Sequence, residues 1–308
     1  MGEALIDIVQ RPGAQPVEYP GGSPLNVAVA LGRLGHTSHL LTQIGSDPRG
    51  QQIRDHAEAS GVQLTSGSLQ DRRTSTALAQ ISSTGAASYT FDLEWAPDPA
   101  GVPAAADAIH TSSIAAVLEP GASTLRDIIT RMRATSLISY DPNIRPALMG
   151  EPEQVLPVVL ANASLATIVK ASDEDVQWLL SGTGRTVDAA GIDAFAEDLL
   201  ARGVALVVIT FGADGARAFT ADGRVDIPAE PVTVADTVGA GDTFSAGLLD
   251  GLARLGLLGA EHQEAIRTLD SERVRALVQH AARLAAVTVS RPGANPPWES
   301  EITDTLTH

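Results

Sequence analysis

The sequence has no cysteine and only one lysine, Lys170, so 20 of its 21 basic residues are arginine. The absence of cysteine excludes disulfides, thiolate metal sites and cysteine nucleophiles, and it fits any redox compartment. The shortage of lysine excludes two common phosphate sites. A P-loop needs a lysine after its glycines, and a protein-kinase site needs a strand lysine paired with a helix glutamate. A bound phosphate would therefore be held by backbone dipoles and arginine.

Excess positive charge and long apolar runs are also missing. The net charge of −16 argues against nucleic acid and anionic membranes as partners, because both are bound mainly by cationic patches. No apolar run approaches the roughly 18 residues that span a bilayer. The opening MGEALIDIVQRPG lacks the basic segment and apolar stretch of a signal peptide, so we expect a cytoplasmic protein.

Apolar strand-like runs alternate with helix-like segments, which predicts a three-layer α/β domain with a mainly parallel sheet. Ser23-Pro24 and Asp47-Pro48 each have the pattern of an N-cap followed by proline, so a helix is expected to begin at each. The other expected elements are strands at 5–9, 39–44, 108–111, 137–140, 166–169 and 205–211, and helices at 122–134, 192–202, 240–255 and 272–289.

Two regions depart from this alternation. Residues 10–20 are rich in proline and glycine, and Ser75–Asp92 predicts two strands around a Thr84-Gly85 turn. Together they predict a small β flap made of about 10–20 and 65–95, acting either as a lid over a pocket or as a plain extension of the sheet edge. No long linker divides the chain, so we expect a single domain over 1–308 that includes this flap.

The stretch VADTVGAGDTFSAGLLDGL, from Val234 to Leu252, has the parts of an anion site. The turn Gly239-Ala240-Gly241 lets an anion approach the backbone N–H groups, and the helix that follows directs its N-terminal dipole there. The carboxylate of Asp242, in the first helical turn, is suited to accept the proton of a hydroxyl that attacks a phosphoryl group. A stabilising acid after a tight turn is the alternative.

This stretch resembles the C-terminal signature of the ribokinase-like carbohydrate kinases, also called the phosphofructokinase B family. GGSPLNVAVALGRLG, residues 21–35, resembles the N-terminal signature of the same family. The resemblance implies an ATP-dependent sugar kinase with an α/β/α core and a β lid. It also implies that Asp242 is the catalytic base and that Gly239, Ala240 and Gly241 form the anion hole.

On the sugar side, the family pattern implies contacts from Asp7, Gly21, Gly22 and Asn26. A carboxylate, an amide and bare backbone suit a polyol, whose hydroxyls need both donors and acceptors. Asp7 has a competing explanation as an exposed strand end, whereas an asparagine early in an apolar helix is harder to explain without a ligand.

YDPNIRPAL, residues 140–148, resembles a segment of fructokinases and ketodeoxygluconate kinases. Asp141 and Asn143 would organise this loop, and Arg145 would hold a phosphate or a substrate carboxylate through its planar fork. A surface arginine in a turn set by two prolines is the alternative.

KASDEDVQWLL, residues 170–180, resembles the part of the family that lies near the metal and phosphates, which implies nucleotide contacts from Lys170 and Ser172. Asp175 stands where glutamate is commoner, and its shorter side chain predicts contact with Mg²⁺ through water. An N-capped helix with acids in its first turn is compatible with the same pattern. VVITFGADGA, residues 207–216, adds Thr210, Gly212 and Gly215 along the nucleotide.

QHAARLAAVTVSRPGANPP, residues 279–297, resembles the helix and loop beside the adenine. His280 stands where asparagine is common, so it is a candidate nucleotide contact, with a packed helical histidine as the alternative. The family often holds a monovalent cation, usually K⁺, with backbone oxygens, which implies Asp236, Val238 and Ser290 as ligands.

We therefore expect transfer of the ATP γ-phosphoryl group to a sugar, and we favour D-fructose as the substrate, giving fructose 6-phosphate. A 2-keto-3-deoxygluconate kinase and a ribose-type kinase are the alternatives. A non-catalytic binding regulator is disfavoured because Asp242 and its glycines are all present. A dinucleotide-dependent oxidoreductase is disfavoured because no G-x-G-x-x-G follows an early strand. The flap could also pair with a second copy to make a homodimer.

Overall fold

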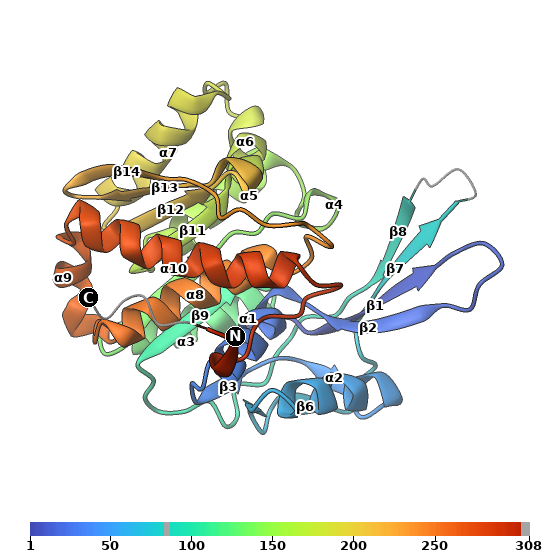
Figure 1. Cartoon of the computed structure of the whole chain (residues 1–308). Coiled ribbons are helices and arrows are strands. Elements are labelled where there is room, and N and C mark those ends of the chain that lie inside the picture. The colour runs from blue at the N-terminus through green and yellow to red at the C-terminus, as the bar shows by residue number, and fades with distance from the viewer. Residues whose placement is uncertain (83–86, 303–308) are drawn as a thin grey trace.

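The computed structural model describes residues 1–82 and 87–302, and it shows a body of helices around a sheet with a second sheet projecting from one side (Figure 1). The sheet of the body has the strand order β14-β13-β12-β11-β10-β9. Strands β9 to β12 run parallel, and β13 and β14 continue the sheet antiparallel. Their bounds are β9 Ala108–Ser112, β10 Leu137–Asp141, β11 Ile168–Ser172, β12 Leu206–Thr210, β13 Ala216–Thr220 and β14 Gly223–Ile227.

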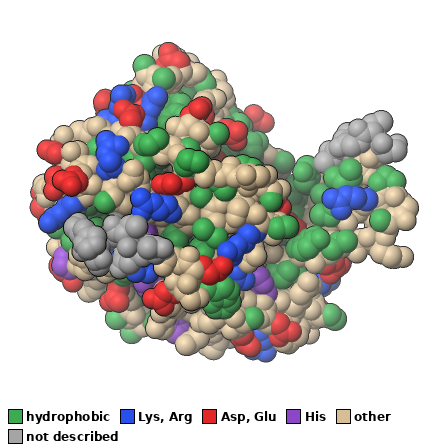
Figure 2. Space-filling model, viewed as in Figure 1, with side chains coloured by type: hydrophobic (Ala, Val, Ile, Leu, Met, Phe, Trp, Pro, Cys, Tyr) green, Lys and Arg blue, Asp and Glu red, His purple; other side chains and the backbone are tan. Residues whose placement is uncertain are grey.

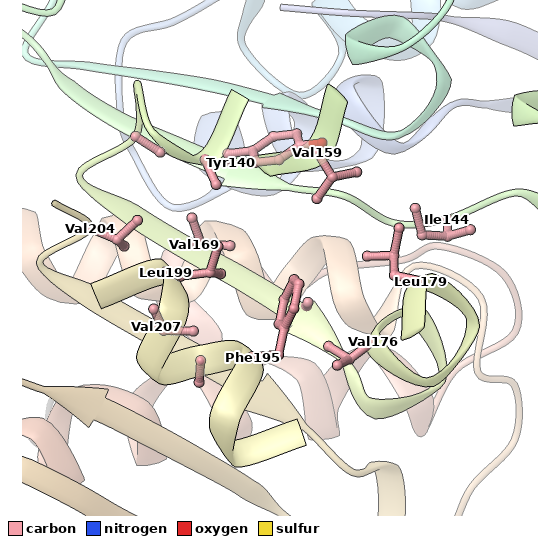
Figure 3. Packing of buried hydrophobic residues seen from close by; sticks show 14 of the residues in the cluster. Tyr140, Ile144, Val159, Val169, Val176, Leu179, Phe195, Leu199, Val204 and Val207 are labelled. Atoms are coloured by element: carbon pink, nitrogen blue, oxygen red, sulfur yellow. The ribbon is translucent and has the colours of Figure 1, made fainter. Parts of the chain in front are cut away.

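Each face of this sheet carries its own helical layer. Alternate strand residues such as Tyr140 and Val169 pack against Phe195 and its neighbours on one side (Figure 3). The strand residues in between, such as Ile168, point to the other face of the sheet and pack against Leu248 there. The first layer is α5 (Pro152–Ala163), α6 (Asp173–Ser181) and α7 (Ala189–Ala201), and the second is α8 (Ala240–Arg254) and α10 (Ser271–Val289). The predicted three-layer α/β/α architecture is confirmed.

The projecting sheet has the order β2-β1-β7-β8. Its strands are β1 (Leu5–Gln10), β2 (Val17–Gly21), β7 (Thr76–Ile81) and β8 (Ala87–Asp92). Strands β7 and β8 form the antiparallel hairpin expected over 75–92, and the expected Thr84-Gly85 turn lies outside the described residues. Strand β1 pairs with β2 and β7 here rather than with the body, because Ile6 and Ile8 pack with residues of the next two helices. The projecting sheet therefore begins at Leu5, earlier than the residue 10 that we expected.

Those two helices, α1 (Ser23–Arg33) and α2 (Pro48–Glu58), begin as their prolines predict. Asp47 caps α2 by accepting the N–H of Gly50 at 2.8 Å. Ser23 does not cap α1, however. Gly22 holds the N-cap position with φ 111, and the Ser23 side chain is directed to another partner. The expected capping role of Ser23 is wrong, with a consequence for the site described below.

One expected strand, 39–44, is divided. β3 (Ser38–Leu40) pairs with β5 (Val62–Leu64), and β4 (Ile44–Gly45) pairs with β6 (Leu69–Gln70), in two separate two-stranded sheets. The remaining elements are the helices α3 (Gly121–Met132), α4 (Pro146–Met149) and α9 (Gln263–Arg267) and the short 3-10 turns η1 (Ser113–Ala116), η2 (Gly212–Asp214), η3 (Ala260–His262) and η4 (Glu299–Glu301). None of the helices within 1–82 and 87–302 is long and apolar enough to cross a bilayer.

Candidate active site

A cavity of about 390 Å³ lies where the projecting sheet meets the carboxyl ends of β9 and β10. Four parts of the chain line it: the projecting sheet, the start of α1, the loops after β9 and β10, and the start of α8. The predicted site residues in its wall are Asp7, Gly22, Asn26, Arg145, Val238, Gly239, Gly241 and Asp242. The two family signatures, about 200 residues apart in sequence, therefore share one cavity.

The carboxylate of Asp242 is the meeting point of these segments. It is only 7% exposed and lies in the first turn of α8. Its Oδ1 accepts the hydroxyl of Ser23 at 2.6 Å, and its Oδ2 accepts the amide of Asn26 at 2.7 Å. The amide of Asn143 lies 3.5 Å from Oδ1. These contacts hold the carboxylate in one orientation at the cavity wall.

The turn before Asp242 requires glycine at two positions. Gly239 is the N-cap of α8 in a left-handed conformation with φ 76, and a Cβ there would lie 2.6 Å from the Cβ of Ala294. A Cβ at Gly241 would lie 2.8 Å from the Nζ of Lys170. The first N–H groups of a helix have no intrahelical partner, so the turn can present donors where Gly239 and Gly241 line the cavity. Ala240, the third residue expected in the anion hole, lies outside the cavity wall, and its N–H donates to the carbonyl of Thr237 at 3.3 Å.

Lys170 does not extend into the cavity as a free cation. Its side chain is 7% exposed, and its Nζ pairs at 2.9 Å with Oδ2 of Asp141. Burial disfavours the ammonium, but the carboxylates of Asp141 and Asp175 outweigh this and raise the pKa of Lys170. The ammonium bonds Asp141 and lies behind Gly241, and its contact with a nucleotide stays a prediction.

Asp175 and Ser172 form a capping box at the start of α6. The Oδ2 of Asp175 accepts the N–H of Ser172 at 2.9 Å, and its Oδ1 accepts the N–H of Ile144 at 2.7 Å. The carboxylate therefore ties the loop after β10 to α6. Its contact with Mg²⁺ stays a prediction.

The other expected nucleotide contacts lie along the same sheet edge, outside the cavity wall. Ser172 and Thr210 are paired across β11 and β12, and the hydroxyl of Thr210 lies 3.4 Å from the carbonyl of Ala171. Gly212 begins η2 with φ 53, and Gly215 follows it with φ 94, so both occupy conformations that favour glycine. Their nucleotide role stays a prediction.

His280 is the residue for which the structure contradicts a nucleotide role. It is 1% exposed, and its Nε2 lies 2.6 Å from Oδ2 of Asp250 on α8. Asp250 also bonds His36 Nε2 and Arg254 Nε, each at 2.8 Å. Burial opposes ionisation, yet hydrogen bonds from His280, His36 and Arg254 hold the pKa of Asp250 well below its ordinary value. His280 packs between α10 and α8, which was the alternative interpretation.

The two segments expected to hold a monovalent cation lie side by side. The carboxylate of Asp236 accepts the N–H of Val238 at 3.0 Å and that of Gly293 at 2.9 Å, bridging the start of the α8 loop to the C-terminal loop. The backbone N–H of Asp236 donates to Val289 at 3.2 Å. The hydroxyl of Ser290 donates to Val287 at 2.7 Å. The cation itself stays a prediction.

The sugar-side residues surround the mouth of the cavity. A Cβ at Gly21 would lie 2.0 Å from Oδ2 of Asp7, so glycine here makes room for that carboxylate. Asp7 is exposed by its accessible surface, as the alternative interpretation held. Desolvation by the surrounding cavity wall still raises the pKa of Asp7 to about 6, and the guanidinium of Arg145 partly offsets this. Arg145 is exposed and donates to the carbonyl of Ile144 at 3.0 Å.

Four residues near Asp242 had no assigned ligand role in the sequence analysis. Ser23 was interpreted as a cap, and Asn143 as a loop organiser. Ser113 and Asn143 both line the cavity with left-handed backbones, φ 58 and φ 37. Glu3 is 7% exposed, and burial raises its pKa to about 8 although it accepts the N–H of Ala115. Ser23 and Glu3 lie inside the quoted segments, whereas nothing in the sequence marked Ser113.

Comparison with known proteins agrees with this geometry. The model of the pfkB family of carbohydrate kinases matches residues 2–301, so the chain belongs to that family and is a carbohydrate kinase. It is 36% identical over 288 residues to a fructokinase of Rhizobium leguminosarum bv. trifolii, covering 89% of this chain and 84% of the relative. It is 31% identical over 303 residues to the fructokinase of Escherichia coli, covering 96% and 93%.

Solved structures show the ribokinase-like fold. A fructokinase of Xylella fastidiosa with bound ATP superposes with a TM-score of 0.78 at 27% identity, covering 95% of this chain and 92% of that one. A fructokinase of Vibrio cholerae O395 with fructose, ADP and calcium ion bound gives 0.73 at 27% identity, with coverage of 95% and 92%. These neighbours bind the nucleotide and the sugar that the sequence led us to expect.

Proposed function

We propose that this kinase transfers the γ-phosphoryl group of ATP to D-fructose, giving fructose 6-phosphate. The observation that carries the mechanism is the carboxylate of Asp242, oriented by Ser23 and Asn26 beside the glycine turn. The fructokinase relatives, and the neighbour holding fructose and ADP, support the choice of sugar.

In the proposed reaction, Asp242 accepts the proton of the attacking hydroxyl. The freed oxygen bonds to the γ-phosphorus, the bond from that phosphorus to the bridging oxygen breaks, and ADP leaves with that electron pair. Donors of the Gly239–Gly241 turn would stabilise charge on the transferred group, because fixed amide dipoles need no reorganisation there. The projecting sheet, whose Asp7 and Phe91 line the cavity, would act as a lid that limits access of water.

The side chains present fit a magnesium ion that arrives on the nucleotide. Within residues 1–82 and 87–302, no three His, Asp or Glu side chains are grouped as a protein-only metal site. Both oxygens of Asp175 accept backbone N–H groups that fix the carboxylate, and its short side chain would reach the ion through water. When bound, the ion neutralises phosphate charge. A monovalent cation such as K⁺ would lie between the Asp236–Val238 and Ser290 segments, which Asp236 holds together.

The main alternative substrate is 2-keto-3-deoxygluconate, followed by a ribose-type sugar. Arg145 at the cavity would suit an acidic sugar. The carboxyl of Asp7 lines the same cavity and has a pKa of about 6, so at neutral pH it is mostly ionised and would repel a substrate carboxylate. The balance favours a neutral polyol. A non-catalytic regulator would not need a carboxylate oriented by two donors.

An ATP-coupled screen over fructose, ribose, 2-keto-3-deoxygluconate, tagatose and nucleosides tests this function. We expect fructose to be the best substrate, and we expect Asp242→Asn to lower kcat by about 10²–10⁴-fold while ATP still binds. Glu272→Gln, at an exposed first-turn acid of α10, is the matched control and should keep full activity. Full activity of Asp242→Asn would refute the mechanism, and activity only on nucleosides would refute the sugar.

We also propose that two copies pair through the projecting sheet in a cytoplasmic homodimer, the location being inferred from the use of ATP. Figure 2 shows apolar side chains gathered on this sheet. Val17, Tyr19 and Tyr89 are 42%, 54% and 62% exposed and lie on the same face of the sheet as Asp7. Light scattering should give twice the chain mass, and Tyr19→Ser with Tyr89→Ser should give monomers. A monomeric wild type would refute the pairing.

A further inference from the structure

The buried pair Lys170–Asp141 has no part in the mechanism above, although it lies directly behind the site. The two side chains are 7% and 1% exposed. The Oδ2 of Asp141 also accepts the hydroxyl of Ser245 on α8 at 3.2 Å, and its Oδ1 accepts the N–H of Asn143 at 3.1 Å. Asp141 therefore joins β10, β11, α8 and the loop that carries Asn143 to the cavity.

The ammonium of Lys170 also lies against the anion-binding turn. A Cβ at Gly241 would be 2.8 Å from Nζ, so the charge abuts the backbone that precedes Asp242. Asp141, Asp175 and Asp242 all act on this ammonium electrostatically, each favouring its charged form. Without Lys170, the carboxylates of Asp141, Asp175 and Asp242 would lie behind and beside the turn with no lysine among them, and Arg145 would be the remaining cation in the cavity wall.

The residue type supports a specific role. Every other basic residue among the 21 Lys and Arg is arginine, and lysine occurs only here. Lysine carries a compact point charge on a thin stem, whereas the planar guanidinium of arginine is wider and is built for two parallel hydrogen bonds. The glycine at 241 and the single acceptor oxygen of Asp141 suit the compact group.

We propose that Lys170 is a positioning residue for phosphoryl transfer. Its ammonium holds Asp141 and the loop after β10, and it supplies the fixed positive charge behind the Gly239–Gly241 turn that lets nucleotide phosphates approach Asp242. This inference rests on the proposed function. A buried ion pair that served stability alone would leave the chemical step unchanged once both charges were removed, since such pairs are often replaceable by neutral groups.

A double-mutant cycle separates the two roles. Lys170→Met leaves Asp141 buried and unpaired, so both the melting temperature and kcat should fall. Lys170→Met with Asp141→Asn removes both charges, so the melting temperature should recover while kcat stays at least about 10-fold low and the KM for ATP stays raised. Asp141→Asn alone should lose less kcat than the double variant. Wild-type kcat and KM in a stable double variant would overturn the proposal.

Two further measurements keep the outcome clear. ATP affinity by calorimetry without sugar should weaken several-fold in the double variant, and an unchanged affinity together with unchanged kcat would refute the role of the charge. Arg254→Met is the matched control, since it breaks the 2.8 Å pair with the buried Asp250 away from the cavity and should alter stability only. If the wild type phosphorylates no sugar, the proposed function fails, whereas the ATP affinities still test Lys170.

Discussion

The hydroxyl of Ser23 donates a 2.6 Å hydrogen bond to Oδ1 of Asp242, across 219 residues of sequence. The first turns of α1 and α8 thus face each other, and the small residues Ala30 and Ala246 pack between the helices with Val27. The hydroxyl of Ser23 bonds Asp242 instead of capping α1, and Gly22 is the N-cap residue of that helix. The bond between Ser23 and Asp242 explains how the N-terminal signature contributes to the orientation of a carboxylate in the C-terminal signature.

Ser23→Ala should lower kcat by about 10–100-fold with little change in ATP affinity, because a hydrogen bond to a charged group contributes about 1.5–3 kcal/mol. Steady-state kinetics measures this. Ser112→Ala is the matched control. It removes the 2.8 Å contact between the hydroxyls of Ser112 and Ser23 but leaves the bond to Asp242 in place, so its effect should be smaller. Equal losses in the two variants would show that Ser23 does not act through Asp242.

Glu3→Gln should change how stability depends on pH. Burial raises the pKa of Glu3 from 4.5 to about 8, so the folded chain keeps this proton where the unfolded chain releases it. The carboxyl therefore destabilises the fold increasingly as pH rises from about 4.5 to 8. The melting temperature of Glu3→Gln minus that of the wild type should increase between pH 5 and pH 8. A constant difference across that range would contradict the raised pKa.

Most of the fold followed from periodicity in the sequence. The buried parallel strand 206–210, LVVIT, is an almost continuous apolar run, and the packing of its two faces into two helical layers is what such a run predicts. Strand β1 is also mainly apolar, although the exposed Asp7 interrupts it, and it pairs in the projecting sheet. Its pattern shows that Ile6 and Ile8 are buried, and only tertiary pairing decides which sheet buries them.

The site was predictable where a motif defined the backbone, and less so where side chains changed partners. Gly239 and Asp242 lie at the cavity wall as the motif implied. His280 was expected to contact the nucleotide, yet it bonds a buried aspartate in the core, and Lys170 also bonds a buried aspartate while its nucleotide contact stays a prediction. Lys170 bonds Asp141, and His280 bonds Asp250. Each aspartate lies about 30 residues away in sequence from its partner, so no local sequence pattern indicates the pair.

Gly239→Ala should remove activity and lower stability by more than the usual cost of a left-handed alanine, which is about 1–2 kcal/mol. The added Cβ would lie 2.6 Å from Ala294, so the turn or the C-terminal loop must shift. Gly256→Ala is the matched control, with φ +68 and no atom within 4 Å of the new Cβ. Gly256→Ala should lower the free energy of unfolding only by the cost of a left-handed alanine, and its kcat should equal that of the wild type. Chemical denaturation and kinetics of both variants check this, and equal behaviour would contradict the steric argument.

Asp250→Asn should be the most destabilising of these changes and should leave the nucleotide site intact. The buried carboxylate bonds His280, His36 and Arg254, and breaking a buried charge pair costs about 3–5 kcal/mol. Urea denaturation at pH 7 measures the loss. ATP affinity should stay at the wild-type value in the variant at a temperature where it is folded, because His280 packs in the core. If Asp250→Asn lost ATP affinity while it stayed folded, the result would show that His280 does contribute to nucleotide binding.

The same cluster gives a second, acid-dependent test. The pKa of Asp250 is held below its ordinary value of 3.8, so its stabilising contribution is complete above that value and is lost as pH falls below it. The gap in stability between the wild type and Asp250→Asn should therefore be widest near neutral pH and should begin to narrow towards pH 3, because the unfolded wild-type chain then takes up a proton on Asp250 that the folded chain does not. Asp188→Asn, at the N-cap of α7, is the control for general acid effects, and its small deficit should change little. A gap for Asp250→Asn that stayed constant from pH 7 to pH 3 would show that the hydrogen bonds from His280, His36 and Arg254 do not depend on the charge.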